Sequence, residues 1–218
     1  MTKFTILILA CGLLFATGLA RSETTDLARA FREDTTGQGQ YALLFARRAL
    51  DYYCLHHDPL SVPDKLPPLL HERGAVFVSA MNSAGAPRCC MGTLLPREPS
   101  LAEEIVSNAC AAAAHDKRFP PIKRSELKQL RLIVSIIGDS RPVDDPHTLD
   151  PVTDGLAVRG PKETGVVLPG ETGSIDTMIK WGRIRAGIKA GDSAEYSRLD
   201  AVRYMEPPRK SPREDTKK

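Results

Sequence analysis

The chain has 218 residues and a mass of 23.8 kDa, which is room for one globular domain or two small lobes that share a core. Hydrophobic residues make up 42% and charged residues 26%, close to the averages of soluble globular proteins, so wholesale disorder is excluded. The net charge of +3 and the 6% aromatic content argue against a nucleic-acid-binding protein, which needs a large basic surplus or a stacking surface.

Residues 1–20 are predicted to be a secretory signal peptide. Lys3 supplies the positive start, Phe4–Phe15 an apolar stretch, and Gly18–Ala20 the small residues that a signal peptidase reads. The alternative is an uncleaved membrane anchor, for which the stretch is short, since a span needs about 20 apolar residues. We therefore expect an exported chain, periplasmic or secreted, with no stable membrane span after cleavage. Export permits disulfides between the four cysteines that remain, Cys54, Cys89, Cys90 and Cys110.

The first half of the exported chain predicts a linker, a helix and a hairpin. Residues 21–39 are polar and predict a linker, and apolar residues at helical spacing predict a helix over 41–56. The apolar runs 75–81 and 88–94 flank the turn residues Asn82–Gly85, a pattern typical of a β-hairpin.

The next helix has a clear start signal. Ser100 with Glu103 three residues later is a capping box, which predicts a helix from there to about His115. The β-branched run Leu130–Ile137 predicts a strand, and the acidic, proline-rich residues 139–154 a long loop. The remaining predicted elements are strands over 155–158 and 165–168, a helix over 174–188, a closing strand over 200–205 and a charged disordered tail over 206–218. Helices and strands alternate without a βαβ rhythm, so we expect an α+β fold.

The sequence contains neither of the common glycine-rich nucleotide loops and no H-E-x-x-H, C-x-x-C or G-x-S-x-G motif. His56 and His57 are adjacent, and neighbouring side chains on a helix point about 100° apart, so a solvated helix end is preferred over a metal site. We therefore predict no cofactor and no metal.

Two short segments carry a family resemblance. The first contains Arg88, Cys90, Gly92 and Thr93, and the second is Asp116–Ile122, which reads Asp-Lys-Arg-Phe-Pro-Pro-Ile. Both resemble motifs of the AMMECR domain family, named for the AMME-syndrome critical region and found as protein A of AmmeMemoRadiSam gene clusters. Cys89 departs from the pattern, since it stands where the family has glycine.

The resemblance covers roughly residues 40–205 and implies a fold rather than a reaction. It implies an α+β domain of two unequal lobes, with a mainly antiparallel sheet flanked by helices and a cleft between the lobes. The cysteine motif is expected to line that cleft. Gene neighbours of the family include a radical-SAM enzyme, and export argues against that partnership for this chain.

Strand alternation gives the cysteine motif a specific geometry. If residues 88–94 form a regular strand, Arg88, Cys90 and Gly92 share one face and Cys89 points into the core. A guanidinium about 7 Å from a thiol favours the thiolate, which would make Cys90 reactive, and Gly92 would leave open surface beside the sulfur. The alternative is that Cys90 packs as a small hydrophobic residue.

Three functions follow from these residues. The first is a binding cleft for an unknown small ligand or an exported protein partner. The second is a thiol enzyme with Cys90 as the nucleophile, Arg88 as its electrostatic partner and His115 as the available base. The third is a structural domain. Further cleft candidates are Gly92, Thr93, His115, Asp116 and Arg118. A Cys54–Cys110 disulfide between two predicted helices is also expected.

Overall fold

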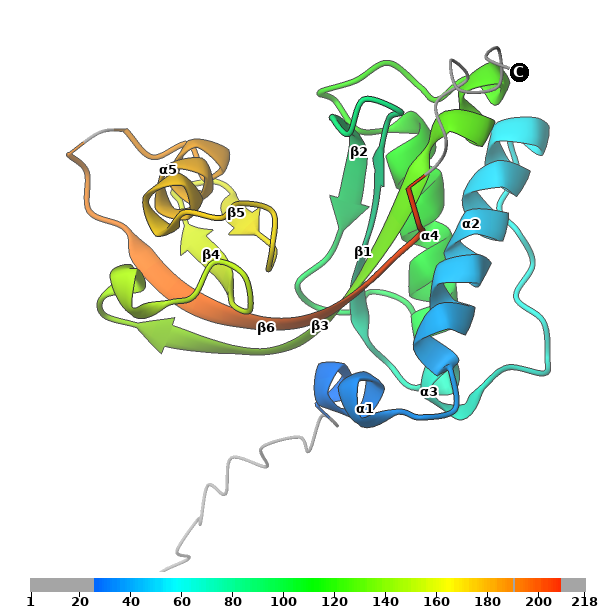
Figure 1. Ribbon diagram of the computed structural model, residues 1–218, viewed down its shortest axis with the longest axis horizontal. Coiled ribbons are helices and arrows are strands. Elements are labelled where there is room, and N and C mark those ends of the chain that lie inside the picture. Colours follow the sequence, from blue (N-terminus) through cyan, green and yellow to red (C-terminus); the bar gives the residue numbers. More distant parts are fainter. Residues whose placement is uncertain (1–25, 190, 209–218) are drawn as a thin grey trace, which may run out of the picture.

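The structure is a computed structural model and describes residues 26–189 and 191–208 (Figure 1). Within these residues, six strands form one antiparallel sheet in the order β2-β1-β3-β6-β4-β5. The predicted α+β class with two lobes is confirmed. The elements are α1 Leu27–Glu33, α2 Gln38–His56, α3 Pro68–His71, β1 Ala75–Met81, β2 Pro87–Gly92, α4 Leu101–Ala114, η1 Arg124–Gln129, β3 Arg131–Val143, η2 Pro146–Thr148, β4 Gly155–Arg159, β5 Thr164–Val167, α5 Ile175–Arg185 and β6 Glu195–Met205.

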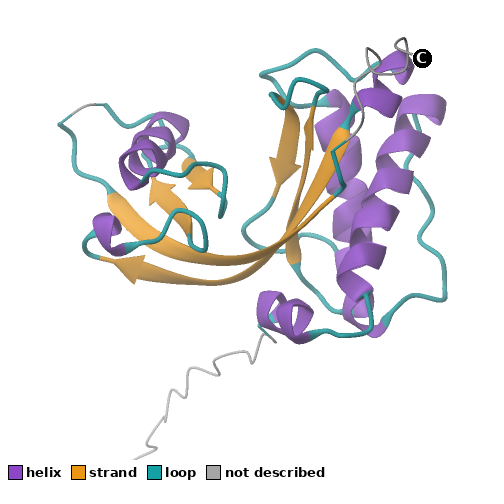
Figure 2. Cartoon of the chain, viewed as in Figure 1, coloured by secondary structure: helices purple, strands orange, loops and turns teal. Residues whose placement is uncertain are grey.

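The larger lobe is a layer of helices on one face of the sheet. Figure 2 shows α2 and α4 side by side against the face of β1, β2 and β3 that is turned away from the smaller lobe, while the opposite face of these strands turns toward it. Alternation along β1 separates the two faces: Val76 and Val78 are fully buried under the helices, whereas Phe77 faces the other way. The sheet therefore offers one face to a core and leaves the other to a site.

The predicted local signals around this core are confirmed. Asn82 accepts hydrogen bonds from the amides of Ala84 and Ala86, and Gly85 has a left-handed φ of 78°, which closes the β1–β2 turn. The hydroxyl of Ser100 accepts the Glu103 amide, so Ser100 caps the start of α4 as predicted; the Glu103 carboxylate accepts from the Ser100 hydroxyl rather than from the Ser100 amide, so the second bond of a capping box is replaced.

The strands β3 and β6 run through both lobes (Figure 1). Residues 133–137 of β3 pair with β6 in the larger lobe and residues 140–143 pair with it in the smaller lobe. The register shifts between them, at Gly138, where a Cβ would lie 2.8 Å from the Cβ of Ala28. The predicted loop over 139–154 is therefore wrong in its first part, because β3 continues to Val143; likewise β6 begins at Glu195 rather than at residue 200.

The predicted linker over 21–39 is corrected for the residues that the structure describes. Residues 27–33 form α1, capped by the Asp26 side chain, which accepts the Arg29 amide. Leu27 and Phe31 are buried, and the Tyr204 hydroxyl donates to the Phe31 carbonyl. A short amphipathic segment beside a charged stretch has a composition close to that of a linker. The predicted signal peptide lies outside the described residues and stays a prediction.

The predicted tail also begins too early. Glu206 is buried. Its carboxylate accepts from two guanidinium nitrogens of Arg47 on α2, Nε and Nη2, and from the Leu132 amide. Arg47 also donates to the Leu130 carbonyl, so this ion pair fastens the end of β6 to α2 and to the start of β3. Residues 209–218 lie outside the described part of the chain. Among the described helices, none is long and apolar enough to cross a membrane.

We predict that Glu206→Gln lowers the free energy of unfolding by about 3 kcal/mol, because it leaves the buried Arg47 guanidinium with only the more exposed and more distant Asp51 carboxylate, at 3.3 Å, as its anion. The side chains of Arg47 and Glu206 are only 11% and 12% exposed. The matched control is Glu195→Gln, which removes an ion pair to Arg159 with both side chains 78% exposed and should change stability by less than about 0.5 kcal/mol. Equal effects in urea unfolding would contradict the assignment.

Candidate functional site

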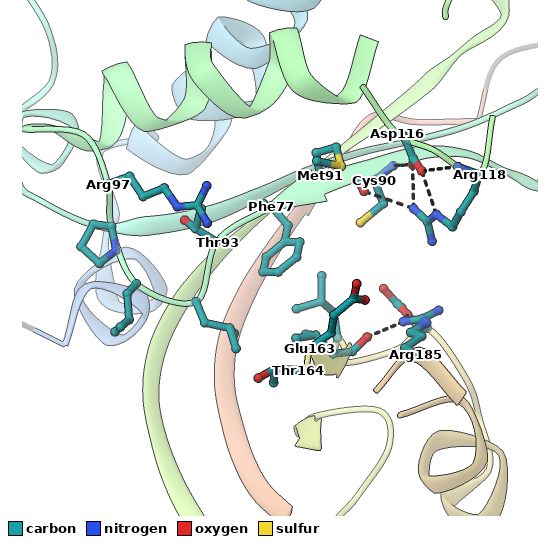
Figure 3. A pocket seen from close by; sticks show the side chains of 17 residues that line it. Phe77, Cys90, Met91, Thr93, Arg97, Asp116, Arg118, Glu163, Thr164 and Arg185 are labelled. Carbon is teal, nitrogen blue, oxygen red and sulfur yellow. Dashed lines mark hydrogen bonds and ion pairs between the residues drawn. The ribbon is translucent and has the colours of Figure 1, made fainter. Parts of the chain in front are cut away.

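A cleft of about 710 Å³ lies between the two lobes. Phe77 and the end of β2 line it on the larger lobe, and β5 with Glu171 and Arg185 line it on the smaller lobe. Figure 3 shows the Cys90 sulfur pointing into this space, with Arg185 on the opposite wall. The predicted interlobe cleft and its cysteine motif are therefore present.

Cys90 sits at one end of the cleft and is held through its backbone. Its amide donates to the Asp116 carboxylate at 2.8 Å, and its carbonyl accepts from the Arg118 guanidinium at 3.1 Å. Its sulfur accepts a hydrogen bond from the Ser79 hydroxyl at 3.0 Å, across the β1–β2 pair. The two resemblance motifs thus meet at one residue.

Asp116 and Arg118 form a clamp that follows α4. The Asp116 side chain is 5% exposed and accepts from the Arg118 amide and from two guanidinium nitrogens, at 2.7 and 2.9 Å. Burial opposes the charge of Asp116, yet these hydrogen bonds and that of the Cys90 amide hold its pKa below the usual range. The Arg118 side chain is half exposed and extends to the cleft over Phe119.

Arg88 does not share the cleft with Cys90, which corrects the alternation argument. The β1–β2 register shifts after the Ala80–Cys89 pair, so that Met81 faces Pro87 and Arg88 has no partner in the ladder. This bulge turns Arg88 to the helix side, where it donates to Glu126 at 2.7 and 3.1 Å and to the Pro121 carbonyl. Cys89 is buried in the core, as predicted.

The Cys90 thiol is not activated. Burial raises its pKa above the ordinary value, and this effect outweighs the Ser79 hydrogen bond and the cations of Arg118 and Arg185, which lower it. Arg88 is not one of the main charges acting on this thiol, because its guanidinium is paired with Glu126. The predicted thiolate stabilised by Arg88 is therefore wrong, because its cation faces elsewhere and desolvation exceeds the remaining charge effects.

Gly92 and Thr93 act through packing rather than by opening the cleft. A Cβ on Gly92 would lie 2.3 Å from the Phe77 ring and 2.6 Å from the Phe77 Cα, so glycine lets this ring lie on the floor of the cleft. The expected open surface beside the sulfur is thus filled by Phe77. The Thr93 hydroxyl donates to the buried Glu104 carboxylate, which also accepts the Arg97 and Glu98 amides and so shapes the rim.

His115 lies away from Cys90. It is exposed at the end of α4 and lines a separate groove with Val106 and Cys110. Neither cavity that contains Cys90 has a histidine among its lining residues. The proposed base for a thiol enzyme is therefore not brought to the sulfur.

The wall of the smaller lobe was missed by sequence reasoning. Arg185 donates to Glu171 at 2.7 Å and to the Val166 carbonyl at 2.5 Å, and its guanidinium lies 5.5 Å from the Trp181 ring centre. Arg203 reaches the same end of the cleft from β6 and donates to the Pro169 carbonyl. The available signal was the spacing of Trp181 and Arg185, four residues apart on one face of a helix.

All four cysteines in the described residues are free thiols. This contradicts the predicted Cys54–Cys110 disulfide, although α2 and α4 pack against each other. Burial raises the pKa of both thiols to about 11, which keeps them protonated at neutral pH. The described residues also hold no group of three or more His, Cys, Asp or Glu arranged for a metal ion.

Comparison with known proteins identifies the family. The AMMECR1 family profile matches residues 43–206. The chain belongs to the AMMECR1 family. A Thermotoga maritima protein is 34% identical over 164 residues, which cover 73% of this chain and 94% of the relative, and a Thermococcus onnurineus protein is 32% identical over 66% of this chain and 71% of its own.

A solved structure supports the same assignment. The crystal structure of the uncharacterized protein PH0010 from Pyrococcus horikoshii is 25% identical and superposes with a TM-score of 0.66. The match covers 78% of this chain and 91% of that one. These matches establish the family and its fold, and the names of the relatives state no activity.

We predict that Asp116→Asn lowers stability by about 2 kcal/mol at pH 7, because Arg118 loses its anion and the Cys90 amide a charged acceptor; the half-exposed Arg118 limits the loss. The folded-state pKa of Asp116 lies below its ordinary 3.8. The carboxylate therefore stabilises the fold fully above that value and loses its contribution as pH falls through the folded pKa. The gap between wild type and variant should narrow as pH falls below about 4 in urea unfolding. A constant gap would contradict this role.

We predict that iodoacetamide labels Cys90 no faster than a free cysteine at pH 7.5, because burial keeps the thiol protonated. Arg88→Ala should leave this rate within about twofold, since the Arg88 guanidinium faces Glu126. Peptide mass spectrometry against time measures both rates. A slowing of tenfold or more in Arg88→Ala would restore the thiol-enzyme interpretation.

Proposed function

We propose that this AMMECR1-family protein is a binding protein for a small organic ligand, which enters the interlobe cleft and contacts both lobes. One observation carries the proposal: polar groups from both lobes converge on one end of a cavity of about 710 Å³, beside an apolar floor. This combination of a concave, partly apolar cavity with a few placed polar groups is typical of small-molecule sites.

The site is preorganised on both sides. Asp116 fixes Arg118 on the larger lobe and Glu171 fixes Arg185 on the smaller lobe, each through contacts of 2.7 Å. A ligand that binds between them meets side chains whose positions are already set, which reduces the entropy lost on binding. A concave cavity of this size favours a small molecule over a flat protein partner.

Cys90 takes part as a neutral thiol. Its raised pKa makes it a weak hydrogen-bonding and packing group at neutral pH rather than a nucleophile. The half-buried sulfur lies where the two ion pairs approach each other, so it would contact a ligand directly. The proposal therefore keeps Cys90 in the site with a different role from the one that its sequence context predicts.

We predict that a mixture of small aromatic acids, their amides and aromatic amines contains members that bind wild type by saturation-transfer NMR. Thr164→Trp should abolish this binding, because Thr164 is exposed and lines the cleft, so a large ring there fills it. The matched control is Thr35→Trp on an exposed loop outside the cleft, which should bind as wild type does. If no member of the mixture binds wild type and fails to bind Thr164→Trp, the cleft does not bind small molecules of these classes and the proposal fails.

A further inference from the structure

The end of the cleft beside Cys90 is rich in guanidinium groups. A second cavity of about 320 Å³ shares Cys90, Arg118, Glu171 and Arg185 with the main cleft and adds Arg203. The three arginines come from three separate segments: the one after α4, α5 and β6. Their arrangement is therefore a product of the tertiary fold and leaves no local pattern in the sequence.

The charges at this end do not cancel. Asp116 pairs with Arg118, and Glu171 pairs with Arg185. Arg203 has no carboxylate among its hydrogen-bond partners; its guanidinium donates to the Pro169 carbonyl. The formal charges of these five groups, which line the end shared by the two cavities, sum to +1; Glu171 is the carboxylate that acts on Arg203 as well as on Arg185, and Glu163 lines the main cleft but not the second cavity. Burial lowers the pKa of Arg203, which means that its cation is poorly solvated.

One donor group at this end lacks a partner among residues 26–189 and 191–208. The Nε of Arg203 is buried and has no hydrogen-bond acceptor, and Arg203 lines the second cavity. Arg203 on β6 lies opposite Ser135 on β3, which in turn lies opposite Phe77 on β1, so Arg203 and Phe77 belong to the cleft face of the sheet; Ser135 is fully buried between them and lines neither cavity. A buried guanidinium with an unsatisfied N–H is unfavourable, and an anionic acceptor beside Arg203 would stabilise it.

We propose that this end of the cleft is a subsite for the carboxylate of a small organic acid, bound by Arg203 with Arg185 and Arg118, while the apolar part of the acid lies on Phe77. This inference rests on the proposed function and names the class of ligand. One uncompensated charge matches a monoanion better than a phosphate dianion, and a guanidinium presents two parallel N–H groups to a carboxylate.

The apolar part of the acid also has a defined place. Phe77, Leu94, Val166 and Leu168 line the main cleft next to the charged end. Trp181 lines the second cavity and is 38% exposed. An acid with a short aromatic body would bury its ring against these side chains and its carboxylate against Arg203, which a polar dianion could not do.

The test uses three probes that share one ring: 3-phenylpropionate, its uncharged amide, and phenyl phosphate. Trp181 is the single tryptophan of the chain, so its fluorescence reports binding at this end of the cleft. At pH 7 we expect wild type to bind the acid at least tenfold more tightly than the amide and more tightly than the phosphate. This comparison needs no variant.

The variant Arg203→Met then tests whether Arg203 supplies the positive charge that recognises the carboxylate. It should reduce the preference for the acid over the amide to about twofold or less while the affinity for the amide stays unchanged. Arg159→Met, on an exposed strand position outside the cleft, should keep the full preference. Arg185→Met is the second variant if Arg203→Met fails to fold, and it should reduce the same preference.

Each outcome has a separate meaning. Equal affinity of acid and amide overturns the carboxylate subsite. If both affinities are also lost in Thr164→Phe, which fills the cleft without adding a second tryptophan, the proposed binding cleft still stands. Tighter binding of phenyl phosphate overturns the choice of a carboxylate. Binding of none of the three overturns this inference, and the proposed function fails as well only if the NMR mixture also gives no cleft-dependent binding.

Discussion

The pairing of β3 with β6 is the interaction on which the rest of the structure depends. These two strands are the spine of both lobes, so the cleft walls are attached to one hydrogen-bonded ribbon rather than to a hinge loop. A small cluster that includes Ala75 and Ile137 on one side and Leu168 and Leu199 on the other packs across the junction. The register shift near Gly138 bends the ribbon, and α1 packs beside the bend. The separation of the two walls is therefore set by the sheet itself.

The electrostatics of the site follow from this rigid frame. A cation about 7 Å from a thiolate stabilises it by roughly 2 kcal/mol at an effective dielectric of 20, or between one and two pKa units. Burial can raise a thiol pKa by several units. At Cys90 the effect of burial on the pKa is larger than that of the cations, because Arg118 and Arg185 are already paired with carboxylates and Arg88 is turned away. The cleft is thus better suited to hold a charged ligand than to create a nucleophile.

Local signals in the sequence were sufficient to predict much of the structure of the larger lobe. The turn at Asn82–Gly85 and the serine cap at Ser100 depend on neighbouring residues, so they could be predicted, and so could the burial of Cys89. The direction of the Arg88 side chain could not be predicted. One extra residue in β2 moves this side chain to the other face of the sheet, and the sequence around a bulge looks like that of a regular strand. Arg203 and Glu171 lie far apart in the chain, and only the β6 ribbon and the fold of the smaller lobe bring them to Cys90.

The paired arginines also explain why the cleft can be charged and selective at once. A free guanidinium in a cleft would be mobile and well hydrated, and a ligand would have to order it. Here Asp116 and Glu171 hold Arg118 and Arg185 in place and cancel their long-range charge, so that a single net charge remains at Arg203. The proposed carboxylate subsite depends on this pairing, because a net charge of +1 suits a ligand with one anionic group. The selectivity that we propose for the site would then come from how its charges are paired, and the ribbon of β3 and β6 connects the two walls that carry them.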